Sequence, residues 1–123
     1  MKLIIDFIED VRESIQNRED FELTAMLLKE DKNNPSKMIY AGESAINSFE
    51  LKDKSLIFKI DGTTNRVSIG DIIPSLLILD MDIMMFELRM NVNANHKDIE
   101  IIGFGKNEEE SKYILFIKLW LED

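Results

Sequence analysis

The sequence contains no cysteine and a single histidine, His96. A chain without cysteine has no disulfide and no thiolate nucleophile, which fits a reducing compartment. Enzymes that work at neutral pH usually rely on histidine, cysteine or two carboxylates held in different environments. The chain therefore has few of the side chains that perform acid–base or nucleophilic chemistry. We expect a protein that is not an enzyme, with no catalytic residue, no resident metal and no cofactor.

Glycine and long apolar runs are also scarce. The five glycines form no phosphate-binding loop, because Gly103-Phe104-Gly105 runs into a polar turn rather than a helix. The apolar stretch Ile72–Leu79 is interrupted by Pro74 and is far shorter than the roughly 20 residues that span a bilayer. The N-terminal apolar run is cut by Asp6 and does not resemble a signal-peptide core. We therefore expect a cytoplasmic protein.

What the chain has in excess is negative charge. It carries 24 Asp and Glu against 15 Lys and Arg, for a formal net charge of −9. Nucleic acids and anionic membranes are bound by clustered basic residues, and the densest lysines (Lys52, Lys54 and Lys59) are interrupted by Asp53. An acidic surface instead attracts basic proteins and speeds their association, although net acidity also keeps a small protein in solution. The expected partner is a basic protein, and neither nucleic acid nor membrane.

Length and hydrophobic periodicity indicate the fold class. At 123 residues with 45% hydrophobic residues, the chain 1–123 is expected to form a single domain. An amphipathic helix is predicted from about residue 3 to residue 16, with one apolar face: Leu3, Ile4, Phe7, Ile8, Val11 and Ile15. Its opposite face carries four carboxylates, Asp6, Glu9, Asp10 and Glu13. A short second helix is predicted from Gly70 to about Leu79, with Asp71 as N-cap and Pro74 in the first turn.

Period-two alternation predicts the strands. They are 21–27, 38–41, 56–60, 84–92, 98–104 and 113–121, and Asp61–Asn65 is expected to be a hairpin-like connection to Val67 and Ile69. Short turns favour antiparallel pairing of neighbouring strands. The predicted fold is therefore α+β: a largely antiparallel sheet of about five or six strands, with the N-terminal helix packed on one face and a second short helix.

The last strand is apolar on both sides. Tyr113, Leu115 and Ile117 share one face, and Ile114 and Phe116 share the other with Lys118. This pattern indicates a central strand or a strand covered by a partner.

Two groups of residues raise the question of a metal site. His96, Asp98 and Glu100 would project to one side of a regular strand, and Asp80 and Asp82 would share one side of a short extended segment. Polar residues beside a turn explain both groups better than a metal site does, so we predict no metal, although the sequence alone does not settle whether either group binds one.

Four methionines lie between residues 81 and 90. Met84 and Met90 belong to the apolar face of the predicted strand, whereas Met85 lies between polar residues and is the better candidate for an exposed contact.

These observations favour a protein that binds a partner. Its most concrete form is an immunity or inhibitor protein that covers the active site of a basic toxin, such as a nuclease. The candidate partner-binding residues are Asp6, Glu9, Asp10, Glu13, Met85, Glu87, Glu108, Glu109 and Glu110. One alternative is a secretion or folding chaperone that acts as a homodimer. Another is an enzyme that uses carboxylates alone or a metal. The partner's identity and the oligomeric state do not follow from the sequence.

Overall fold

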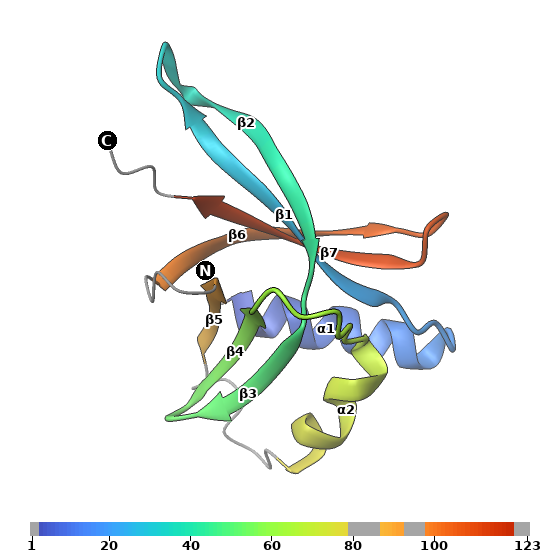
Figure 1. The fold of residues 1–123 in the computed structure, drawn as a ribbon. Helices are drawn as coiled ribbons and strands as arrows, with labels where there is room; N and C mark the ends of the chain where they lie inside the picture. The colour runs from blue at the N-terminus through green and yellow to red at the C-terminus, as the bar shows by residue number, and fades with distance from the viewer. Residues whose placement is uncertain (1–2, 79–86, 93–97, 120–123) are drawn as a thin grey trace.

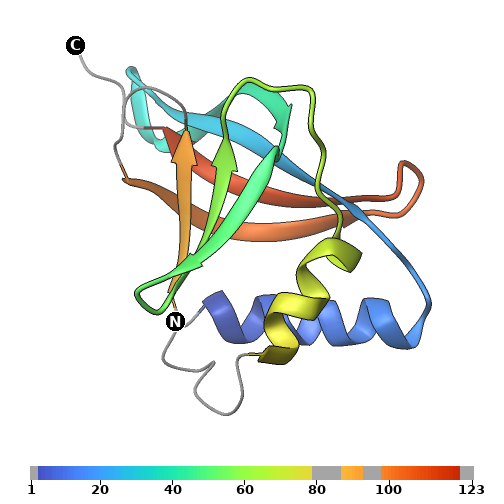
Figure 2. The same cartoon turned by 60° about the horizontal axis from the view of Figure 1, so that its bottom comes forward.

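The computed structural model describes residues 3–78, 87–92 and 98–119. These residues form two helices, α1 (Leu3–Gln16) and α2 (Ile69–Ile78). They also form seven strands: β1 (Glu22–Asp31), β2 (Asn34–Ala45), β3 (Ser48–Lys52), β4 (Ser55–Ile60), β5 (Glu87–Val92), β6 (Asp98–Asn107) and β7 (Lys112–Leu119). Figure 2 shows both helices beneath the strands. The predicted α+β class, with an N-terminal helix and a short second helix, is confirmed.

The strands follow the order β2-β1-β7-β6-β5-β4-β3 (Figure 1). Four neighbouring pairs are antiparallel, so the sheet is largely antiparallel as predicted. Two pairs, β1–β7 and β4–β5, are parallel. The described residues form seven strands rather than five or six, because β3 (Ser48–Lys52) was not predicted, although Phe49 and Leu51 alternate with polar residues there. Of the two explanations given for the apolar last strand, the structure shows the central position, since β7 lies between β1 and β6.

The sheet has two halves that are joined in two places. At β5–β6 the register joins only Met90 to Ile99 and Asn91 to Asp98, so the halves β2-β1-β7-β6 and β5-β4-β3 meet there through a short ladder. The second junction is covalent, because only Ile46 and Asn47 separate β2 from β3, the two ends of the sheet order. The Ile46 N–H donates to the Leu23 carbonyl, and the Asn47 N–H donates to the Lys59 carbonyl. One continuous segment therefore contacts both halves.

Helix α1 covers one face of the sheet, which we call the core face. Its buried side chains follow the 3-4-3 spacing of a single helical stripe: Ile4, Phe7, Val11 and Ser14. The expectation that Ile15 belongs to this stripe is wrong, because its side chain is 49% exposed. The buried stripe continues at Ser14 instead, and a residue one position later points about 100° away around the helix.

Phe7 lies at the centre of the core and is fully buried. Its ring packs edge-on against Phe58 of β4 and Tyr113 of β7, with centroid distances of 5.5 and 5.9 Å. A third ring, Phe104 of β6, lies 6.0 Å away. A single helical side chain therefore contacts strands from both halves of the sheet.

The segment after β4 is not the predicted hairpin. The side chain of Asn47, 6% exposed, donates to the carbonyls of Thr63 and Asn65 and accepts from the Asp61 N–H, at 3.1, 2.8 and 2.9 Å. Val67 then bonds to Leu23 of β1 and to Ile46 instead of pairing with β4. Asn47, which lies at least 14 residues before this loop, therefore holds residues 61–65 in place. The turn residues of the loop do not predict this contact.

Helix α2 begins at Ile69, one residue before the predicted Gly70, but its N-cap is not the predicted Asp71. Ser68 precedes the first helical residue, and its N–H donates to Asp71 Oδ2 at 2.8 Å. Ser68 is therefore the N-cap, and Asp71 is the reciprocal partner at the third helical position, as in a capping box. Pro74 lies in the second turn rather than the first, so the helix lacks one internal hydrogen bond there.

Strands β1 and β2 extend beyond the body of the sheet as an arm (Figure 1). The register shifts between Leu27 and Leu28, opposite Gly42, which has a φ of +139°. A backbone angle in this region favours glycine, so Gly42 allows the bulge. Beyond the bulge, Ile39 and Tyr40 are exposed large apolar side chains, 37% and 58% accessible.

Candidate functional site

The four carboxylates predicted on one face of α1 have different environments. Glu9 is exposed, and Glu13 is exposed but lies 3.4 Å from Lys106 Nζ of β6. Asp6 is half-buried. Asp10 is also half-buried, and its Oδ2 accepts a 2.6 Å hydrogen bond from the Tyr113 hydroxyl. Asp10 therefore holds α1 to β7, and the acidic face of the helix is narrower than the sequence suggested.

Burial, together with the hydrogen bond to Asp10, raises the pKa of Tyr113 well above its ordinary value. A tyrosine pKa that is higher in the folded chain stabilises the fold below pH 10, and this contribution is lost as pH rises further. We expect Tyr113→Phe to lower stability at pH 7 by about 2 kcal/mol, because the Asp10 carboxylate loses a donor. Above pH 10 the difference should shrink by about 1.4 kcal/mol per pH unit. Urea denaturation of both proteins from pH 7 to pH 11 measures this stability difference.

Tyr40→Phe is the matched control, because the Tyr40 side chain is 58% exposed. We expect it to leave both the stability at pH 7 and its pH dependence unchanged. Absorbance at 295 nm of the Tyr40→Phe protein should show that Tyr113 ionises only on unfolding. A stability difference for Tyr113→Phe that stays constant across pH 7–11 would contradict this account.

The remaining predicted partner-binding residues lie at two separate places. Glu108, Glu109 and Glu110 are exposed in the turn between β6 and β7, as predicted for this connection. Glu87 is exposed at the start of β5, which lies on the opposite side of the molecule from that turn in both ribbon views (Figures 1 and 2). Met85 lies outside the described residues. The structure therefore brings Glu13 near β6 but does not gather all the predicted residues into one surface.

The candidate metal ligands fall mostly outside the described residues. This applies to Asp80, Asp82 and His96, and to the side chain of Asp98, while Glu100 is exposed on β6. Within the part of the chain that the structure describes, no three His, Asp or Glu side chains are placed to hold a metal ion.

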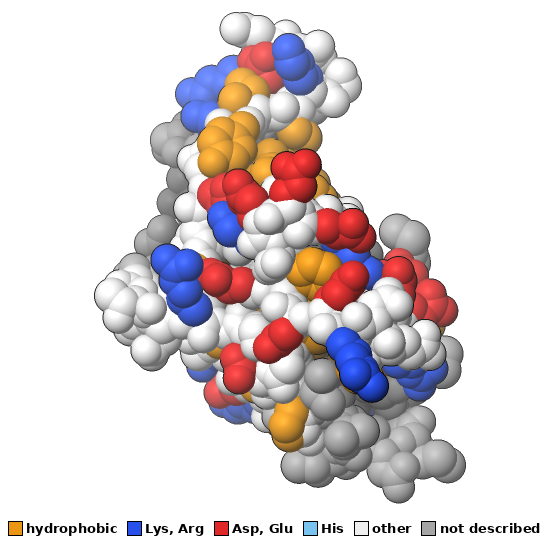
Figure 3. All heavy atoms as spheres, turned by 90° about the vertical axis from the view of Figure 1, so that its right-hand side faces the viewer, with side chains coloured by type: hydrophobic (Ala, Val, Ile, Leu, Met, Phe, Trp, Pro, Cys, Tyr) orange, Lys and Arg blue, Asp and Glu red, His pale blue; other side chains and the backbone are white. Residues whose placement is uncertain are grey.

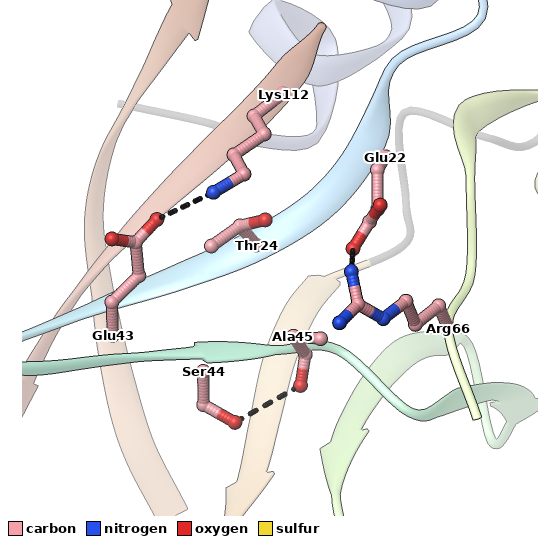
Figure 4. A pocket seen from close by; sticks show the side chains of 7 residues that line it. All are labelled: Glu22, Thr24, Glu43, Ser44, Ala45, Arg66 and Lys112. Carbon is pink, nitrogen blue, oxygen red and sulfur yellow. Dashed lines mark hydrogen bonds and ion pairs between the residues drawn. The ribbon is translucent and has the colours of Figure 1, made fainter. Parts of the chain in front are cut away.

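A charged pocket lies on the face of the sheet opposite α1, which we call the outer face. Its volume is about 260 Å³, and its lining residues are Glu22, Thr24, Glu43, Ser44, Ala45, Arg66 and Lys112. They come together because β1 pairs with both β2 and β7: Glu22 is the register partner of Lys112, and Thr24 is the partner of Ala45. Figure 4 shows Thr24 between two ion pairs.

The first ion pair joins Arg66 Nη1 to Glu22 Oε1 at 3.0 Å. The second joins Lys112 Nζ to Glu43 Oε1 at 3.7 Å, and the same ammonium lies 3.2 Å from Glu110 Oε2. The hydrogen bond and charge of Glu110, followed by the charge of Glu43, raise the pKa of Lys112. Two carboxylates and two cations therefore line the pocket, and a third carboxylate, Glu110, contacts Lys112 from outside the lining.

Glu22, Glu43 and Arg66 were not among the predicted site residues. Glu22 is visible as a polar residue on the exposed side of an alternating strand, but Glu43 falls in a segment whose structure was ambiguous. Glu43 reaches Glu22 through the pairing of β2 with β1, and Arg66 reaches it through the bridge between Glu22 and Ser68. Lys112 joins them through the parallel pairing of β1 with β7, whose partners lie 90 residues apart in sequence. Of the contacts around the pocket, only that between Lys112 and Glu110 joins residues close enough in sequence to be predicted from local spacing.

No known protein family, curated protein sequence or solved structure matches the chain. The function is therefore inferred from the residues of this chain alone. Neither of the described helices is long and apolar enough to cross a membrane.

Proposed function

We propose that this protein binds a basic protein partner, and that it acts as an immunity or inhibitor protein for a cationic toxin domain. The observation that carries the proposal is the exposed Glu108–Glu110 turn in a chain of net charge −9. Within the described residues, Glu110 is paired with Lys112, whereas Glu108 and Glu109 have no cation beside them. Three adjacent carboxylates on a projecting turn create a negative potential that attracts a cationic surface.

The same side of the molecule carries further carboxylates. Figure 3 shows acidic side chains spread over the middle of the face that includes the β6–β7 turn, below the hydrophobic side chains of the β1–β2 arm. Charges of this kind speed the encounter of two proteins, whereas a few apolar anchors slow their dissociation. Tyr40, 58% exposed on the arm, is the largest such side chain among the described residues.

The test compares the wild-type protein with two variants as affinity baits in an extract of the native cells. The first variant combines Glu108→Gln, Glu109→Gln and Glu110→Gln. The matched control removes three exposed or half-exposed carboxylates elsewhere through Glu50→Gln, Asp53→Asn and Glu100→Gln. We expect a basic protein to be retained by the wild type and the control and lost from the first variant. Its association with the wild type should slow steeply as salt rises, because ions screen the attraction.

The inhibitor role has its own test. The captured protein is expressed in a host cell with and without this chain, and we expect growth only when both are present. Capture of neutral or acidic proteins alone would contradict the proposal. So would turnover of a small molecule by the purified chain that one aspartate replacement abolishes, because that result identifies an enzyme. The absence of cysteine makes the cytoplasm the expected compartment.

A homodimeric chaperone is the second candidate, and one observation favours it. Strand β2 lies at an end of the sheet order and carries the exposed side chains Ile39 and Tyr40. An edge strand with exposed apolar residues is a surface on which a second strand can pair. Light scattering after size-exclusion chromatography separates the two functions. A stable homodimer that dissociates on Tyr40→Ser favours the chaperone, and a monomer favours the inhibitor.

A further inference from the structure

We propose that the charged pocket on the outer face binds an arginine side chain presented by the partner protein, a proposal that rests on the proposed function. The site consists of the two ion pairs Glu22–Arg66 and Glu43–Lys112 with Thr24 between them (Figure 4). It lies beside the Glu108–Glu110 turn, because Lys112 contacts both Glu43 and Glu110.

The charge of the pocket selects a cation. In the pocket wall, Glu22 and Glu43 balance Arg66 and Lys112. Glu110 contacts the same Lys112 ammonium from outside the lining, so the pocket and its edge together carry one surplus negative charge. The raised pKa of Lys112, caused by Glu110 first and then Glu43, with a smaller contribution from Glu22, indicates the same negative potential. Exposed Glu108 and Glu109 follow one another in the adjoining turn and add to it.

The Thr24 hydroxyl is the second, independent observation. The Thr24 side chain is only 3% exposed, yet it lines the pocket, and none of the hydrogen bonds found among the described residues involves its hydroxyl. Among the described residues, Ser14 Oγ is the one enclosed side-chain atom without a partner, so the Thr24 hydroxyl is reached from the pocket, where it is available to a ligand. An N–H of a guanidinium can donate to this oxygen.

The existing ion pairs can exchange their partners. Arg66 is 67% exposed, and the Lys112–Glu43 distance of 3.7 Å is too long for a strong hydrogen bond. Ion pairs that solvent reaches, as it reaches both of these, add little to stability. An incoming guanidinium, which is planar and has five donors, can therefore reach the carboxylates of Glu22 or Glu43 in a two-pronged contact that an ammonium cannot make.

The test titrates the isotopically labelled protein with N-acetyl-arginine amide, while two-dimensional NMR follows the backbone amides. We expect saturable shifts at Thr24, Ser44 and Ala45. N-acetyl-citrulline amide, which has the same shape but no charge, should bind about tenfold more weakly, because the charge-assisted hydrogen bonds are lost. The lysine analogue should also bind more weakly than arginine.

Two variants locate the site. Glu43→Gln should weaken arginine binding by about fivefold or more, because it removes one carboxylate of the pocket. Glu50→Gln is the matched control, because it removes a comparable ion pair, with Lys59 at 3.1 Å on β3–β4, and should leave binding unchanged. The same spectra report whether each variant is folded, and Glu22→Gln replaces Glu43→Gln if that variant is not.

The failure of this proposal is distinct from that of the proposed function. Shifts confined to the Glu108–Glu110 turn, equal shifts with the citrulline analogue, or no shifts at all overturn the arginine pocket. None of these outcomes contradicts the proposed function, which the affinity-bait experiment tests separately.

Discussion

Phe7→Ala is expected to lower the free energy of unfolding by about 4 kcal/mol, the largest effect of any single substitution considered for this chain. The Phe7 side chain is fully buried, and its ring contacts Phe58, Phe104 and Tyr113. Its removal leaves a cavity between α1 and both halves of the sheet, which the surrounding rings can fill only in part. Because a domain of this size is stable by only about 5–15 kcal/mol, a large share of the total is lost.

Urea denaturation followed by circular dichroism measures this effect. Ile15→Ala on the same helix is the control, because Ile15 is 49% exposed and its truncation should cost less than about 1 kcal/mol. If the two substitutions cost the same, the ring cluster is not the centre of the core and the described packing of α1 is wrong.

Asn47→Ala is expected to lower the free energy of unfolding by about 3 kcal/mol. The Asn47 amide donates to the carbonyls of Thr63 and Asn65, and its oxygen accepts from the Asp61 N–H. Alanine leaves these three backbone groups without their partner and frees the connection between β4 and α2. Thermal or urea denaturation measures the loss, and amide exchange should increase first at residues 61–65.

Asn33→Ala is the control for this prediction. Asn33 is exposed in the β1–β2 turn, where the hydrogen bond to Asp31 comes from its backbone N–H, and the truncation should change stability by less than about 0.5 kcal/mol. Asn47→Asp tests the mechanism further, since a carboxylate keeps the acceptor for Asp61 but cannot donate to two carbonyls. An Asn47→Asp protein as stable as the wild type would show that the amide donors are unimportant.

The parts of the fold that were predictable are those that depend on local periodicity. The alternation of Tyr113, Leu115 and Ile117 predicted a buried face, and all three are fully buried. The helical stripe through Phe7 and Val11 was equally clear. Strand β3 was missed although Phe49 and Leu51 alternate with polar residues, because a five-residue pattern of this kind is a weak signal and the strand is held in place by its pairing with β4.

The parts that were not predictable depend on contacts between distant segments. Asp10 was expected to face a partner, yet its carboxylate accepts from Tyr113, 103 residues away. The charged pocket requires β1 to pair in parallel with β7, and nothing in either strand specifies that partner. The N-cap of α2 was also predicted wrongly. The sequence contains the Ser68–Asp71 capping box, but Asp71 was predicted as the N-cap in place of Ser68, three residues earlier.

The covalent link between β2 and β3 has a consequence for how the molecule opens. Residues Ile46 and Asn47 take part in hydrogen bonds to β1 on one side and to β4 on the other, while Val67 also bonds to Ile46. Detaching either half of the sheet breaks bonds that fix this segment and so weakens the other half as well. The backbone amides of residues 46 and 47 are therefore expected to exchange with solvent only through global unfolding, and neither half can be excised as an independently folding piece.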